Sequence, residues 1–240
     1  MSRFDHEEPK AMKFRTPPVL LCGWALLTAA PLQASEESTD ATPHLVPMPP
    51  FVEEYDRVVF DLLIGARESE FWMLVKPSFS PEYSLVISKK KSGGAGQVRE
   101  YEVRWSQPVK SIWQLGRFSS PGSVRATPRI SVKIDQRKVS IPADLVDDYF
   151  APLWRFNLNA VRTPESGYSL GLDGTTYGFF ARPNQYGEIW QPRRGAPRKL
   201  AELGECLIVF VRATEAERGG RLANCTELAS EFKVPQEKRN

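Results

Sequence analysis

The sequence predicts an α+β fold in which a mostly antiparallel meander sheet is packed by two or three helices. Three segments space their apolar residues as on one face of a helix, and short β-rich runs with alternating polarity lie between them. Turn residues such as Asp-Gly and Pro-Asn separate the later runs, and strands joined by short turns pair antiparallel. With 240 residues, 41% hydrophobic and 25% charged, the chain is long enough for one good-sized core.

The first fifty residues are predicted to lie outside the folded domain. An uncharged apolar run at 19–30 follows Lys13 and Arg15, so residues 1–34 are interpreted as a signal peptide, with Met12 as an alternative start. The same run is also compatible with an uncleaved anchor or with lipidation at Cys22. The remaining predicted boundaries are a disordered Pro-rich stem at 35–50, a single α+β domain at 51–232 and a flexible tail at 233–240.

The first half of the domain is predicted to hold one helix followed by strands. Apolar residues recur at helical spacing from Tyr55 to Ile64, which predicts the helix. Polarity alternates in several later runs, and a polar segment, 135–138, interrupts the last pair and predicts a hairpin turn. The predicted strands are 71–75, 83–87, 100–105, 130–134 and 139–141.

The longest helix signal follows Pro142, a residue that suits the first helical turn. Its apolar stripe consists of Val146, Phe150, Leu153, Trp154, Leu158 and Val161. Pro152 removes a backbone donor inside this stripe, so we expect a kink there, with a break into two short helices as the alternative.

Asp173 and Gly174 are typical of a two-residue turn, which predicts a hairpin between strands at 168–172 and 175–180. Pro183 and Asn184 predict a further turn into a strand at 186–190. A last helical stripe, 200–211, follows four basic residues, for which a solvated loop is expected and an anionic partner is the alternative. These residues are Arg193, Arg194, Arg198 and Lys199.

Removal of the signal segment leaves two cysteines, Cys206 and Cys225, an even number in an oxidising compartment. We therefore expect a disulfide that pins the last helical stripe to segment 222–232. On the chain-entropy model it would stabilise the fold by roughly 3 kcal/mol. The protein is expected to be periplasmic or secreted, with membrane contact only through the signal segment.

The composition argues against several functions. The only histidines, His6 and His44, precede the domain, so a His-based zinc site or a Cys-His or Ser-His nucleophile is not expected inside it. The glycines at 93–96 precede a strand pattern instead of a helix, which argues against nucleotide binding. After residue 34 the chain has 28 basic and 26 acidic residues, which does not indicate nucleic-acid binding. No cofactor and no metal are predicted.

Carboxylates remain as candidate catalytic groups. Asp173 and Glu188 could approach each other across neighbouring strands as the acid and base of a glycan hydrolase. The simpler interpretation is that Asp173 makes the turn and Glu188 is an outward strand residue. Asp147 and Asp148 are interpreted as matching the helix dipole.

The motif from Gly171 to Tyr177, together with the strand from Gly187 to Trp190, resembles secreted bacterial proteins of unassigned function that carry an LDGTTY-type hairpin and a G-E-x-W strand. The resemblance covers the C-terminal half of the chain. It implies export and carries no activity or catalytic residue.

Three functional hypotheses follow. The first is a non-catalytic exported binding or protective protein, of the kind represented by immunity proteins, whose partner is an unknown protein or envelope component. The second is a carboxylate-dependent cell-envelope glycan hydrolase that uses Asp173 and Glu188. A structural envelope component with the stem as a spacer is a third hypothesis.

Overall fold

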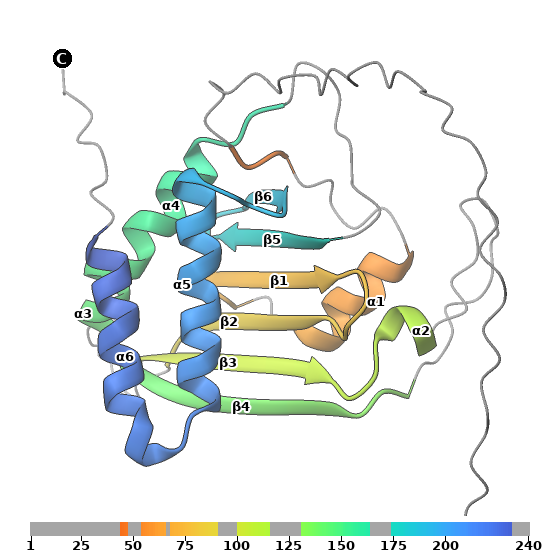
Figure 1. The fold of residues 1–240 in the computed structure, drawn as a ribbon, viewed down its shortest axis with the longest axis horizontal. Helices are drawn as coiled ribbons and strands as arrows, with labels where there is room; N and C mark the ends of the chain where they lie inside the picture. Colours follow the sequence, from red (N-terminus) through yellow and green to blue (C-terminus); the bar gives the residue numbers. More distant parts are fainter. Residues whose placement is uncertain are drawn as a thin grey trace, which may run out of the picture. The chain divides into compact units, whose positions relative to one another are not determined.

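The computed structural model describes residues 44–47, 54–65, 68–90, 100–115, 131–163 and 174–231. They contain a six-stranded antiparallel sheet with the order β4-β3-β2-β1-β5-β6, which confirms the predicted α+β class (Figure 1). The strands are β1 (Phe71–Pro77), β2 (Tyr83–Lys89), β3 (Glu100–Pro108), β4 (Ile134–Pro142), β5 (Thr175–Ala181) and β6 (Gln185–Trp190). The first four strands form a meander, and β5 then pairs with the free edge of β1.

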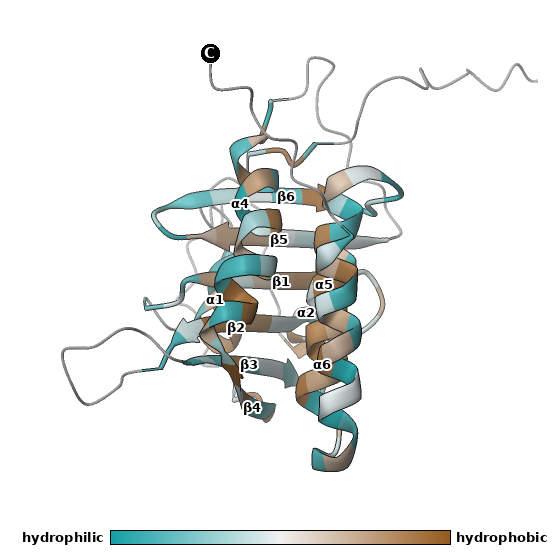
Figure 2. Ribbon diagram, turned by 90° about the vertical axis from the view of Figure 1, so that its left-hand side faces the viewer, coloured by the Kyte–Doolittle hydropathy of each residue, from teal (hydrophilic) through white to brown (hydrophobic). Residues whose placement is uncertain are grey.

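Helices cover both faces of the sheet, and the hydrophobic sides of α5 and α6 face it (Figure 2). One face carries α1 (Glu54–Leu63) and the short α2 (Ile112–Leu115). The other face carries α3 (Ala143–Leu145), the π-helix η1 (Val146–Phe150), α4 (Ala151–Asn159), α5 (Gly195–Arg212) and α6 (Glu215–Ser230). More helices pack on the sheet than the two or three predicted.

The central strand β1 shows why both layers are needed. Successive strand residues point to opposite faces, so Phe71, Met73 and Val75 enter the larger core under α3 to α6. Trp72 and Leu74 enter the smaller core under α1. All five side chains are buried, as expected of a strand covered on both sides.

The expected kink at Pro152 takes the form of a π-helical turn. Residues 143–159 are helical throughout, but the Ala151 amide donates to the Val146 carbonyl, five residues back. Pro152 cannot donate to the carbonyl four residues earlier and its ring would crowd that carbonyl. The wider turn accommodates the ring without ending the helix.

The predicted hairpin turn at 135–138 is wrong. These four polar residues lie inside β4, which continues from Ile134 to Pro142 and pairs with β3 along its whole length. β4 is at the edge of the sheet and Asp135, Gln136, Arg137 and Lys138 are exposed, so an edge position tolerates a polarity that resembles a turn.

Around β5 the prediction is only partly testable. The predicted partner strand 168–172 and Asp173 lie outside the described residues, and both edges of β5 are occupied, by β1 and by β6. The second predicted turn is confirmed: β5 and β6 form a hairpin through Pro183, which follows a cis bond, and Asn184, whose φ is 53°.

Part of the predicted stem packs on the sheet. Leu45 is 1% exposed and belongs to the larger core, and Val46 forms a β-bridge with Glu188 through two backbone hydrogen bonds of 2.9 Å. One apolar residue among prolines gives no periodic signal, so pattern reasoning placed the start of the domain after these residues.

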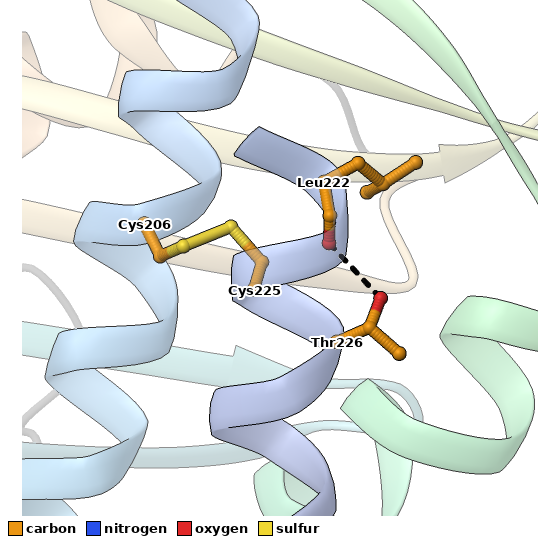
Figure 3. The surroundings of a disulfide bond; sticks show 4 residues. All are labelled: Cys206, Leu222, Cys225 and Thr226. Carbon is orange, nitrogen blue, oxygen red and sulfur yellow. Dashed lines mark hydrogen bonds between the residues drawn. A yellow bond between two sulfur atoms is a disulfide. The ribbon is translucent and has the colours of Figure 1, made fainter. Parts of the chain in front are cut away.

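The predicted disulfide between Cys206 and Cys225 is present and joins α5 to α6 (Figure 3). Segment 222–232 was predicted only as a pinned segment, whereas residues up to Ser230 are helical. The capping box of Thr214 and Glu217, which starts α6, was the sequence signal for this helix.

Candidate functional site

A groove of about 590 Å³ lies between α5 and the adjoining parts of β5 and segment 191–193. Its walls combine apolar surface with two carboxylates and two guanidinium groups. The lining residues are Thr175, Tyr177, Gln191, Pro192, Arg193, Arg198, Ala201, Glu202, Glu205, Cys206 and Val209. This mixture is typical of a binding site, because apolar walls supply contact area and a few polar groups fix orientation.

Glu205 is the most constrained charged group of the groove. The Tyr83 hydroxyl donates a 2.6 Å hydrogen bond to its Oε1, and Tyr177 contributes a second side-chain hydrogen bond. Both tyrosines stand in register with Val75 of β1, Tyr83 on β2 and Tyr177 on β5. Neighbouring strands are about 4.8 Å apart, so the backbones of the two tyrosines are about 10 Å apart, one on each side of Val75. Their side chains hold Glu205 between them.

A glycine allows α5 to place Glu205 this deeply. The helix crosses the strands of the sheet (Figure 1), and at Gly204 it lies directly on Met73. A Cβ at Gly204 would overlap with the Met73 thioether, so a larger residue would push the helix away from β1. The disulfide at Cys206 then ties the following residue of α5 to α6.

Burial raises the pKa of Glu205, and the hydrogen bonds from Tyr83 and Tyr177 oppose this shift. Burial, together with the negative charge of Glu205, raises the pKa of Tyr177 to about 12. Burial first, and then the hydrogen bond to Glu205, also raise the pKa of Tyr83. Both phenols are therefore protonated at neutral pH and act as donors to the carboxylate.

Two of the basic residues near the groove, Arg198 and Lys199, pair with acidic residues. Arg198 donates from Nε to Glu202 at 2.6 Å and from Nη1 to the Arg193 carbonyl at 2.9 Å. Lys199 lies 3.7 Å from Glu231. An anionic partner, which the sequence left open, would have to compete with these carboxylates.

Glu188 does not reach the groove. It pairs with Gly178 on β5, on the opposite face of the sheet from Tyr177. Burial raises its pKa, and Lys76 opposes that shift, although Lys76 itself forms a 2.9 Å salt bridge with Asp56. Asp173, its predicted partner, lies outside the described residues.

Asp147 and Tyr186 have structural contacts. Asp147 accepts a 2.8 Å hydrogen bond from the Tyr101 hydroxyl. Tyr186 packs on Phe180, with ring centroids 4.9 Å apart, and also on Trp72. These contacts favour structural roles, in holding η1 to the sheet and in packing the aromatic side chains of β1, β5 and β6 together.

Sequence reasoning missed Glu205. It stands within the apolar stripe of α5, but nothing in the sequence showed that Tyr83 and Tyr177 would flank the same residue of β1. That relation depends on the strand order, because β2 and β5 are far apart in the chain and both pair with β1.

Within the described ranges, no group of three or more His, Cys, Asp or Glu side chains could hold a metal ion. None of the described helices is long and apolar enough to cross a membrane. Comparison of the chain with protein-family models, with curated proteins and with solved structures finds no match. The groove is therefore interpreted from its own chemistry.

Proposed function

We propose that the protein is a non-catalytic exported binding protein and that its partner, a protein or an envelope component, occupies the groove beside α5. The observation that carries this proposal is the groove itself, which joins apolar walls to the oriented Glu205 carboxylate. A protective role of the kind that immunity proteins have is one form of this function.

The rim of the groove supports binding to a large partner. Val209 is 48% exposed on α5, and Arg193 is exposed on the opposite wall. Apolar and arginine side chains on one open surface are typical of protein interfaces. The Cys206–Cys225 disulfide supports an oxidising compartment and therefore export.

Site-specific photocrosslinking in cells of the source organism tests this proposal. A photoreactive residue is placed at Val209 on one wall and, separately, at Arg193 on the other. The matched control is Val109, a valine that is 53% exposed and does not line the groove. We expect the same partner to be crosslinked from both groove positions and not from position 109. Crosslinking from position 109 alone, or from no position, would contradict the proposal.

A carboxylate-dependent glycan hydrolase is the second candidate, and one observation favours it. Glu205 is a carboxyl group with a raised pKa in an open groove, and such a group suits a general acid. Glu202 lines the same groove and could act as the base, although it is paired with Arg198.

The two candidates differ in a direct assay. Incubation of the full chain with purified cell-wall glycan should release no soluble fragments if the protein only binds. Release that disappears in Glu205→Gln but persists in Glu188→Gln would replace the binding proposal with the hydrolase. Release that disappears only in Glu188→Gln would support the catalytic residue predicted from the sequence.

A further inference from the structure

Extending the proposed function, on which this inference rests, we propose that the groove receives a basic side chain, lysine or arginine, of a partner protein, with its cation against the Glu205 carboxylate. The chemistry follows from how this chain treats its other buried carboxylates.

Buried carboxylates need a compensating partner, either a cation or a full set of hydrogen-bond donors. Glu82, which is 1% exposed, has the second kind, because it accepts four hydrogen bonds from neutral groups. Glu70, which is 8% exposed, has Lys89 at 3.4 Å and Arg182 at 3.7 Å. Glu188 has the charge of Lys76 nearby. Within the described part of the chain, no ion pair joins Glu205 to a cation. Of Glu70, Glu188 and Glu205, only Glu205 lines the groove.

The carboxylate has acceptor capacity left for a ligand. Its two oxygens can accept about four hydrogen bonds, and the phenols of Tyr83 and Tyr177 supply two. The phenols also fix its orientation, so a cation entering the groove would meet an ordered anion. The apolar walls, which include Ala201, Pro192 and Val209, suit the methylene stem of lysine or arginine.

The charges that face Glu205 do not prevent this binding. Arg198 on the same helix is neutralised by Glu202, and Arg193 lies at the exposed rim, where solvent and salt screen its charge. β2 and β5 present only the neutral phenols. A bound cation would also lower the raised pKa of Glu205, so affinity should increase as the pH rises through that pKa.

The probe is the tripeptide acetyl-Gly-Lys-Gly-amide, titrated into the 15N-labelled full chain and followed by amide chemical shifts. Its control is the norleucine tripeptide, which keeps the stem and lacks the charge. We expect saturable shifts around residues 202–209, with a Kd on the order of 1 to 10 mM for so small a fragment. The norleucine peptide and the isosteric Glu205→Gln variant should each bind at least about tenfold more weakly. Glu188→Gln, which removes a partly buried carboxylate on the opposite face, should bind as the wild type does.

The outcomes separate this inference from the proposed function. Equal binding of the norleucine peptide, undiminished binding by Glu205→Gln, or the absence of local shifts would overturn the cation assignment. If the partner is still crosslinked from both walls of the groove, the binding function stands with a different ligand chemistry. If the peptide does not bind and no partner is crosslinked, both this inference and the proposed binding function fail.

Discussion

Glu82 and Glu205 are both at least partly buried, but their surroundings differ. Glu82 is 1% exposed and accepts four hydrogen bonds, from the Tyr55 and Ser111 hydroxyls and from the Ile112 and Trp113 amides. Glu205 is partly buried, receives hydrogen bonds from two phenols and lines an open groove.

Burial alone therefore does not identify a functional carboxylate. The donors to Glu82 come from α1 and from the start of α2, so this group holds two elements of the smaller layer together and is fully occupied. The donors to Glu205 come from β2 and β5, so they join α5 to the sheet but leave part of the carboxylate unoccupied. What distinguishes the two is spare acceptor capacity and access from solvent.

The largest effect is expected for Glu82→Ala. The change leaves four donors without their acceptor and should lower the free energy of unfolding by about 4 kcal/mol, measured by urea denaturation of the full chain. Glu102→Ala removes a partly exposed glutamate that forms a 3.1 Å salt bridge with Lys138, and it should cost less than about 1 kcal/mol. Similar losses in the two variants would contradict the structural role of Glu82.

The next largest loss of stability is expected when the disulfide is removed. Cys206 and Cys225 are 19 residues apart, and replacing both with serine should lower the free energy of unfolding by about 3 kcal/mol, because the unfolded chain regains the freedom of that loop. The loss should be concentrated around α6, seen as faster amide exchange there than around α2. Equally faster exchange around α6 and α2 would show that the helices on the two faces of the sheet do not unfold independently.

The sequence predicted α1 and α5, because packing against a sheet demands helical spacing of their apolar residues. It predicted β1 from a run of β-favouring residues. The prediction failed for β4, because the exposed polar residues of this edge strand resembled a turn. It also failed for α6, because Gly219 and Gly220 weakened the helix signal. The disulfide was predictable from cysteine count alone. The groove was not, since it depends on which strands flank β1.

A smaller effect is expected when a donor to Glu205 is removed. Tyr83→Phe keeps the ring and deletes the hydroxyl that lies 2.6 Å from Oε1, so stability should fall by about 1 to 2 kcal/mol. Loss of this donor should also raise the pKa of Glu205 further, because the hydrogen bond stabilises its charged form. An NMR titration of the side-chain carboxyl carbon measures that shift, and an unchanged or lowered pKa would contradict the assigned contact.

The smallest effect, and the sharpest contrast with Glu82, is expected for Glu205→Gln. The pKa of Glu205 is raised in the folded state, so between the ordinary glutamate value and the raised value the native protein binds more protons than the unfolded chain. The free energy of unfolding of the wild type therefore loses a contribution as the pH rises through this window. The glutamine variant lacks this titration.

Urea denaturation of both proteins from pH 4 to pH 8 should show the glutamine variant gaining on the wild type as the pH rises, by no more than about 1 kcal/mol after solvent screening of this partly exposed group. A relative loss of stability with rising pH would mean that the folded state favours the charged carboxylate. Glu205 would then be a structural acceptor satisfied by the hydrogen bonds of its own chain, and the premise that it needs a cationic ligand would fail.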